Sequence, residues 1–433
     1  MKKATSIDTP VEAISTTALP PIKVCMHVLR RARTDYRAMR TASTLIKAGF
    51  AVSIVDVECG TKLPHEEHSG GISLKHMIIP NWYTSRSFQP WFFVTAVRTF
   101  MLSICRLFHS QADIYHAVEL TALPACYVVA KVRRKPLIFE AYELHIPVPE
   151  TDVKFWRLLG PLLLRLLATI LPRCAGVITT TPGYAQEFRK HFHVPEVSLV
   201  RNIPVYRAVQ KSDLLRQYLG LSSGTRIALY QGGLQRNRGL DKLVRAAAFL
   251  EPGIVIVLMG EGMGTFQKQL EVLIASEGVA DRVKIIPPVP SYEEFLNWTA
   301  SADIGLIAYT PSYSLAVKLI LPNKLFEYIM AGVPVLATEL DSIIEVIRTY
   351  DVGQISSSAA PADIGAAINE MLADPVALDR MHTNALRAAR EDLHWEKESQ
   401  QLIHLYNHIL YHNETLSAPP GKHSRQMSAE TSG

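Results

Sequence analysis

The chain has 433 residues, of which 48% are hydrophobic and 20% are charged, and its formal net charge is +5. This composition is globular, and the length favours two domains of about 200 residues over a single core. So small a charge for this length excludes the strongly basic surface on which nucleic-acid binding depends, so no nucleic-acid partner is expected.

The five cysteines are scattered and include no Cys-x-x-Cys pair, which indicates a reduced, cytoplasmic protein. Residues 1–21 contain Lys2 and Lys3 but no sustained apolar stretch, so a disordered lead-in is expected there and not a signal peptide. Residues 413–433 are polar and are expected to be a disordered tail. No ligand cluster with metal spacing stands out, and no metal is expected.

The N-terminal half alternates apolar stretches of strand length with helical ones. Strands are expected at 22–28, 51–57, 72–79, 113–116, 136–140, 176–181 and 197–200, and helices at 35–48, 87–108, 120–132, 156–171 and from about Pro182. A polar loop is expected at 60–71. A β-loop-α-β opening followed by such an alternation predicts a parallel sheet.

Two of these helices, 87–108 and 156–171, are strongly apolar, but each is interrupted by two arginines. A membrane span needs about 20 mostly apolar residues, so neither is expected to cross a bilayer. Two interpretations remain: the helices pack within the domain, or they lie on a membrane face with Trp91, Phe92 and Phe93 inserted.

Polar residues cluster at or just after the strand ends of this half. They are His116, Glu119, Glu140, Tyr142, Glu143 and His145. Open parallel sheets place their sites at these ends, although each residue taken singly is equally consistent with a solvated loop.

The second half repeats the alternation, with strands expected at 226–231, 254–259, 283–286, 303–308, 333–337 and 352–355. It predicts a second doubly wound domain, connected to the first after Asn202. An amphipathic stretch at 402–410 is expected to cross back to the first domain.

The first strand of this second domain runs into a basic, glycine-containing loop that opens a helix. Backbone amides at Gly232 and Gly233, with Arg236 and Arg238, are suited to cradle a diphosphate. By itself the signal is weak, because the dinucleotide pattern Gly-x-Gly-x-x-Gly is absent.

The stretch 321–336 is the most informative in the chain. Pro322 suits the first turn of a helix, and Gly332 suits a left-handed helix end before an apolar strand. Lys324 then lies in the first turn, where the helix dipole disfavours a cation unless an anion is bound nearby. Glu327 lies one turn further on, where a sugar hydroxyl would satisfy it. The alternative is an ordinary surface pair between Lys324 and Glu327.

Together these motifs resemble the family 4 glycosyltransferases, retaining enzymes of the GT-B fold with two facing Rossmann-like domains. The resemblance covers about residues 22–412 and rests on six stretches: 116–119, 139–144, 230–240, 259–262, 302–306 and 322–335.

The resemblance implies an acceptor-binding domain at 22–203, a nucleotide-sugar-binding domain at 204–395 and a crossing-back helix at 396–412. It implies transfer of a sugar from a nucleotide-diphosphate sugar to a glycan or lipid-linked acceptor in polysaccharide or glycolipid assembly. The nucleotide sugar is the donor substrate, and neither a further cofactor nor a metal is expected. The protein would be cytoplasmic and peripheral on the inner face of the cell membrane, so a membrane surface is a further candidate partner.

The resemblance also assigns residues. Those expected in catalysis are Arg238, Lys324, Tyr142 and His116. Those expected to bind the donor are Gly232, Gly233, Arg236, Gly262, Asn323 and Glu327, with the donor ribose on Glu327.

The chain departs from the family pattern at three positions. Leu319 replaces the first motif glutamate, Gly233 stands where a basic residue is common, with Arg236 as its candidate substitute, and Tyr142 stands where many relatives have histidine. A non-catalytic GT-B partner or regulatory subunit therefore remains the alternative function. A nicotinamide dehydrogenase is disfavoured, because neither half shows the glycine fingerprint.

Overall fold

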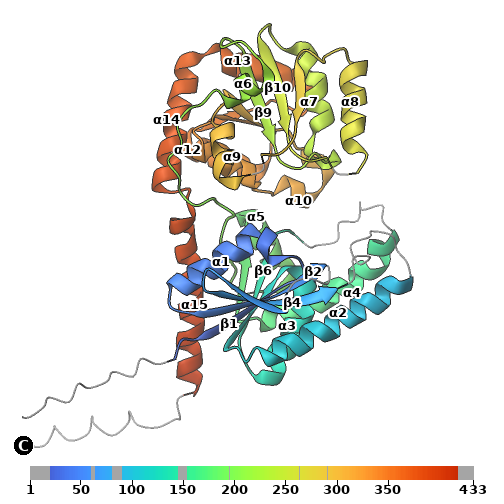
Figure 1. The fold of residues 1–433 in the computed structure, drawn as a ribbon, viewed down its shortest axis with the longest axis vertical. Coiled ribbons are helices and arrows are strands. Elements are labelled where there is room, and N and C mark those ends of the chain that lie inside the picture. The colour runs from blue at the N-terminus through green and yellow to red at the C-terminus, as the bar shows by residue number, and fades with distance from the viewer. Residues whose placement is uncertain are drawn as a thin grey trace, which may run out of the picture.

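The computed structural model describes residues 20–59, 64–79, 90–144, 154–194, 196–262, 264–289 and 291–417. The chain forms two α/β units, one above the other, each built around its own sheet (Figure 1). His145, most of the expected lead-in and the end of the expected tail lie outside the described residues.

The sheet of the N-terminal unit has eight strands in the order β3-β4-β2-β1-β5-β6-β7-β8. Their bounds are β1 Lys23–Val28, β2 Ala51–Cys59, β3 Glu66–Ser69, β4 Ile72–Ile79, β5 Ile114–Val118, β6 Leu137–Ala141, β7 Gly176–Thr179 and β8 Ser198–Leu199. The central strands β5 and β6 are buried throughout, as expected when helices cover both faces.

One expectation for this sheet is wrong. Part of the polar segment 60–71 is not a loop, because Glu66–Ser69 pairs antiparallel with β4 as the edge strand β3. The hairpin turn uses Gly70 and Gly71 at φ 57° and 82°, a conformation that glycine adopts freely. A polar, exposed edge strand carries no apolar alternation by which the sequence would reveal it.

The helices of this unit are α1 Tyr36–Lys47, α2 Pro90–His109, α3 Glu119–Arg133, α4 Lys154–Ile170 and α5 Pro182–Phe192. In the described part of the chain no helix combines the length and apolar character needed to cross a bilayer.

The C-terminal unit has six parallel strands in the order β11-β10-β9-β12-β13-β14. They are β9 Arg226–Gln231, β10 Ile254–Met259, β11 Val283–Ile286, β12 Ile304–Ile307, β13 Val335–Ala337 and β14 Gly353–Ile355. The helices are α6 Leu214–Leu219, α7 Leu240–Ala246, α8 Phe266–Ser276, α9 Tyr292–Thr299, α10 Leu315–Lys318, α11 Asn323–Met330, α12 Asp341–Tyr350, α13 Pro361–Ala373 and α14 Pro375–Glu391. The strand order reverses between β9 and β12, and such switch points open a crevice at the carboxyl ends of the strands.

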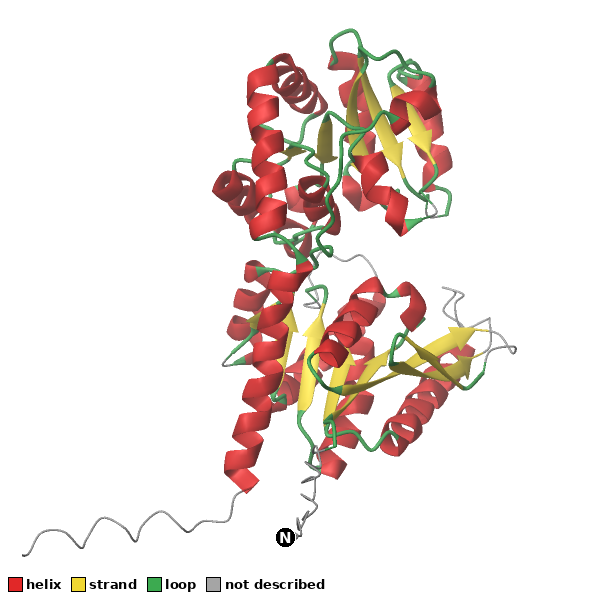
Figure 2. Cartoon of the chain, turned by 60° about the vertical axis from the view of Figure 1, so that its left-hand side comes forward, coloured by secondary structure: helices red, strands yellow, loops and turns green. Residues whose placement is uncertain are grey.

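A single long helix, α15 Trp395–Ser417, joins the two units. Figure 2 shows it running from the upper unit down along the lower one. Its Trp395 indole donates to Thr44 Oγ1 over 2.8 Å, and its Tyr406 hydroxyl lies 2.8 Å from His116 Nδ1. The expected crossing-back helix is therefore confirmed.

A buried charge network lies beneath this helix. Arg37 of α1 donates to Glu140 Oε1 over 2.6 and 2.9 Å, and His116 Nε2 lies 3.2 Å from Glu140 Oε2. Burial by itself would raise the pKa of Glu140, but the charges of Arg37 and His116 lower that pKa to about 2. The ionised carboxylate therefore favours the folded state.

We predict that Glu140→Gln lowers the free energy of unfolding by about 3 to 5 kcal/mol, because it leaves Arg37 buried without its counter-charge. Since the folded-state pKa is depressed, the wild-type contribution is present above the ordinary pKa of 4.5 and is lost as the pH falls towards about 2. Urea unfolding at several pH values measures both effects. Asp113→Asn, which breaks the exposed pair with Lys135, is the control and should change little; an equal loss in both variants would contradict the prediction.

Candidate active site

A cavity of about 390 Å³ lies between the two units, where the carboxyl ends of β9 and β12 face the N-terminal unit. The N-terminal unit contributes Tyr142, Glu143 and Thr180 to its wall. The remaining lining residues are Asn202, Tyr230, Gln231, Gly232, Gly233, Arg238, Phe295, Tyr309, Ile320, Leu321, Pro322, Asn323, Lys324 and Glu327.

Helix α11 brings several of these residues to the cavity. Pro322 is its extended N-cap rather than a residue of its first turn, and Gly332 follows its end at φ 68°, as expected. The hydroxyl of Tyr328 donates to Leu229 O over 2.8 Å and accepts from Gln231 N at 3.1 Å. A methyl group added at Gly305 would lie 2.5 Å from the Tyr328 ring, so this glycine lets α11 press directly onto the sheet.

Lys324 is only 6% exposed, so the interpretation of Lys324 and Glu327 as a surface pair is wrong. Its Nζ lies 3.5 Å from the ring centroid of Tyr230 and 5.3 Å from that of Tyr309. Burial, and then the nearby charge of Arg238, lower the pKa of Lys324 well below its usual value.

Arg238 also faces the ring of Tyr309, with its guanidinium carbon 4.8 Å from the ring centroid. Two cations that are far apart in the sequence thus meet at one tyrosine beside the N-terminus of α11. Like charges in a buried place repel, so this arrangement favours an anion between them.

Glu327 is oriented by its neighbours. Its Oε2 accepts from Gln231 Nε2 over 2.8 Å, and Gln231 Oε1 in turn accepts from Thr299 Oγ1 over 2.9 Å. Burial raises the pKa of Glu327, against the hydrogen bond from Gln231 and the charges of Lys324 and Arg40. The carboxylate is therefore placed to accept further hydrogen bonds in the cavity.

The expected glycines let backbone segments approach closely. Gly232 has φ 119°, and a methyl group at Gly260 would lie 1.9 Å from Gly232 O. Beside this turn is a second cavity of about 540 Å³. It shares Gly232, Gly233 and Phe295 with the first and is completed by Gln235, Met259, Gly260, Glu261, Gly262 and Pro288.

Two expected site residues lie elsewhere. Arg236 turns towards α8, where it lies 5.4 Å from the ring of Phe266 and donates to Gln269 Oε1. It does not line the cavity, where it was expected as the basic substitute for Gly233.

His116 is the second correction. It is fully buried, between Glu140 and Tyr406 of the crossing helix, and is not among the lining residues. Its place within β5, and not beyond the strand's end, turns it into the core. Its contacts in the structure are with Glu140 and with Tyr406 of α15, not with the cavity.

Tyr142 does face the cavity. Its backbone amide donates to Glu119 Oε1 over 2.6 Å, and Glu119 has a left-handed φ of 68°. The guanidinium groups of Arg30 and Arg37 lie 5.5 and 5.1 Å from its ring centroid. Asn323 also lines the cavity and accepts from Asn202 Nδ2 over 2.8 Å.

Leu319, at the position of the family's first glutamate, does not line this cavity. It packs against the N-terminal unit, where a methyl group added at Gly183 would lie 2.8 Å from Leu319 Cδ2. Nearby, Tyr184 donates from its hydroxyl to Ala316 O over 2.8 Å. This position therefore serves contact between the units.

Three residues that line the cavity were not predicted from the sequence: Tyr230, Tyr309 and Gln231. Gln231 ends β9 and Tyr309 follows β12, so their position at strand ends was an available signal. Their side chains are aromatic or neutral, however, and carry neither the charge nor the glycine backbone that distinguished most of the predicted residues.

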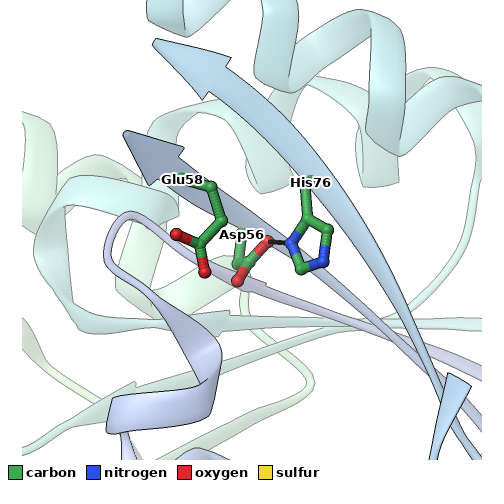
Figure 3. A group of neighbouring side chains, drawn as sticks. All are labelled: Asp56, Glu58 and His76. Carbon is green, nitrogen blue, oxygen red and sulfur yellow. Dashed lines mark hydrogen bonds and ion pairs between the residues drawn. The ribbon is translucent and has the colours of Figure 1, made fainter. Parts of the chain in front are cut away.

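A buried acidic cluster was also missed. Asp56 and Glu58 of β2 and His76 of β4 bring one ligand atom each within 4.8 Å of one another (Figure 3). His76 lies opposite Asp56 in the parallel register, a neighbourhood that sequence spacing does not reveal.

These side chains already have protein partners. His76 Nδ1 lies 2.6 Å from Asp56 Oδ1, the amide of Ala32 donates to Asp56 Oδ2 over 2.9 Å, and Arg31 lies 3.2 Å from Glu58. The cluster is thus an anchor for the loop 30–35.

Two α/β units that face each other across a cavity, with a basic helix N-terminus in it, define the GT-B class. Comparison with known proteins agrees. A sequence profile described as "Glycosyltransferase Family 4" matches residues 36–203, and one described as "Glycosyl transferases group 1" matches residues 211–388. The chain belongs to this family of glycosyltransferases.

Relatives share limited sequence. The D-inositol 3-phosphate glycosyltransferase of Thermobispora bispora is 26% identical over 249 residues, which cover 54% of this chain and 56% of that protein. The match thus spans about half the length of such curated relatives.

Solved structures match over more of the chain. Sucrose-phosphate synthase from Thermosynechococcus elongatus has a TM-score of 0.72 at 16% identity, covering 90% of this chain and 100% of that one. Anabaena Alr3699/HepE in complex with UDP-glucose has a TM-score of 0.65 at 15% identity, covering 89% and 100%. At these identities the likeness establishes the fold.

We predict that binding of a nucleoside diphosphate takes up a proton at Lys324. A bound diphosphate would favour the charged amine and raise its lowered pKa. The affinity for the nucleoside diphosphate should therefore fall as the pH rises from the pKa of Lys324 in the free protein towards its pKa in the complex. Calorimetry in buffers of different ionisation enthalpy measures the uptake. Lys324→Arg should abolish it, whereas Lys318→Arg, at an exposed lysine paired with Asp341, should leave it unchanged. Equal uptake in all three proteins would assign the proton to another group.

Proposed function

We propose that this protein is a retaining glycosyltransferase that moves a sugar from a nucleotide-diphosphate sugar to a glycan or lipid-linked acceptor. The observation that carries the proposal is the meeting of Lys324 and Arg238 on Tyr309 beside the N-terminus of α11. A buried lysine, a partly buried arginine and backbone amides at one point are suited to a diphosphate.

The two cations suit the chemistry of sugar transfer from a nucleotide diphosphate. Breaking the bond between the sugar and the diphosphate builds negative charge on the leaving oxygen, and groups that bind this charge more strongly in the transition state accelerate the step. Lys324 and Arg238 would stabilise the leaving diphosphate, and Glu327 would accept hydrogen bonds from the donor ribose. The nucleobase would occupy the adjoining cavity beside Phe295 and Gly262.

The name of the HepE complex makes a UDP-sugar the first donor to test. The acceptor would approach from the N-terminal unit, past Tyr142 and Glu143. A panel of nucleotide sugars and acceptors would identify the sugar and the linkage. The same panel tests the non-catalytic alternative. Nucleotide binding without release of UDP from any nucleotide sugar would favour a partner subunit, in line with the absence of a carboxylate at Leu319.

We also propose that the protein docks at the inner face of the cell membrane through α2. Part of the buried face of this helix is polar while an exposed face is apolar: Thr99 and Ser103 face the core, whereas Val97 and Met101 are 58% and 53% exposed. Val94 and Phe108 extend the apolar face, and Arg98 lies exposed beside it. An apolar face with basic neighbours suits an anionic bilayer.

On α4, Leu162 and Leu166 are exposed beside Arg165. The aromatic side chains expected to insert, Trp91, Phe92 and Phe93, lie outside the residues whose side chains the structure describes.

The donor site is tested by a double-mutant cycle of Arg238→Ala and Lys324→Ala, with affinities for UDP and uridine measured by calorimetry. Each change removes a charged hydrogen bond to the diphosphate, so UDP should bind about tenfold or more weakly, while uridine is nearly unaffected. Arg245→Ala, which removes an exposed arginine paired with Glu277, is the control. Equal small losses for both ligands would place the diphosphate elsewhere.

Membrane docking is tested by flotation with phosphatidylcholine vesicles containing phosphatidylglycerol. The wild type should float at low salt, and Val97→Glu with Met101→Glu should abolish flotation, because a charge on the apolar face opposes insertion. Val272→Glu with Val376→Glu places the same charges on exposed sites of the C-terminal unit and should still float. Absence of wild-type flotation would refute this docking surface.

A further inference from the structure

A third cavity, of about 280 Å³, adjoins the proposed donor site on the side of the N-terminal unit. It shares Tyr142, Asn202, Asn323 and Glu327 with the first cavity. Most of its remaining wall comes from one segment, residues 30–40, which places three arginines around it: Arg30, Arg37 and Arg40.

The three guanidinium groups differ in how far they are already engaged. Arg37 is held by Glu140 and by Val200 O, but its buried Nη1 has no hydrogen-bond partner. Arg40 lies 4.3 Å from the Trp395 ring and donates to Asn202 Oδ1. Arg30 is half exposed, with its Nε 3.4 Å from Asp35 Oδ2.

The charges around this cavity leave it positive. Its lining residues include two carboxyl groups, Asp35 and Glu327, against three guanidinium groups. Burial raises the pKa of both carboxyl groups, so both are less readily ionised than free ones. Glu140, the principal partner of Arg37, does not line the cavity.

The start of the segment 30–40, which carries these arginines, is also fixed in place. Besides the bond from Ala32 N to Asp56, Arg30 O accepts from Val57 N over 3.3 Å. Arg31 pairs with Glu58 and does not line the cavity, whereas Arg30 does. Binding an anion here would therefore require little reordering of the loop.

We propose that this cavity binds a phosphate group carried by the acceptor, with Arg30, Arg37 Nη1 and Arg40 as donors. A phosphate offers several acceptor oxygens, and guanidinium forks match them well. The acceptor hydroxyl would then point across Tyr142 towards the donor. The proposal rests on the proposed function, and it narrows the acceptor class to sugar phosphates or phosphate-bearing lipids.

The test titrates inorganic phosphate into the UDP-saturated protein by calorimetry, so that the diphosphate site is already filled. Arg30→Ala should weaken phosphate binding about tenfold or more, because a charge-assisted hydrogen bond is lost. Arg33→Ala is the matched control, since Arg33 lies in the same loop, pairs with Glu67 and does not line the cavity. It removes the same charge and should bind phosphate as the wild type does.

Two results would overturn the proposal: no phosphate binding by the wild-type protein, or equal weakening in the Arg30 and Arg33 variants. Failure of the proposed function would show separately, as absent UDP binding. In that event the phosphate titration is carried out with the Arg238→Ala variant, whose proposed diphosphate site lacks its arginine, in place of the UDP-saturated protein.

Two further ligands distinguish the sources of the phosphate. Stronger binding of D-inositol 3-phosphate than of inorganic phosphate, lost in Arg30→Ala, supports a soluble acceptor. Binding to phosphatidic acid vesicles that depends on Arg30 and not on Arg33 supports a lipid acceptor.

Discussion

The burial of Lys324 beside Arg238 is the constraint on which the site depends. An amine among Tyr230, Tyr309 and the backbone of Gly232 loses most of its hydration, and Arg238 adds a second positive charge. Desolvation and the repulsion from Arg238 both oppose the charge on Lys324, and the attraction to Glu327 offsets them only in part. A diphosphate would relieve both at once. The Tyr328 contacts that press α11 onto the sheet maintain this geometry.

The N-terminal unit depends on a different buried charge. Glu140 joins Arg37 of α1 to His116 of β5, and His116 in turn contacts Tyr406 of α15. One carboxylate therefore couples α1, whose Arg37 and Arg40 line the third cavity, to α15, the helix that returns from the C-terminal unit. The partners of such a group are needed together, since removal of one leaves a buried charge uncompensated.

Leu319 shows how a motif position can change its use. A glutamate there would be expected to serve the donor sugar, whereas the leucine packs on Gly183 of the opposite unit. The cavity retains Glu143 and Glu327 as its lining carboxylates. The apolar contact, with the Tyr184 bond to Ala316, holds the two units together beside the cavity.

The sequence by itself determined the two doubly wound units, because buried parallel strands are written as contiguous apolar stretches; β9, β10 and β11 match their expected bounds. It also determined the α11 motif, where proline and glycine act through local backbone preferences. It could not place Arg236 or His116, nor find the edge strand β3 or the cluster of Asp56 with His76. Those features depend on which face a side chain takes and which strands become neighbours. Only the tertiary structure decided them, because contacts between distant segments leave no periodic trace in the chain.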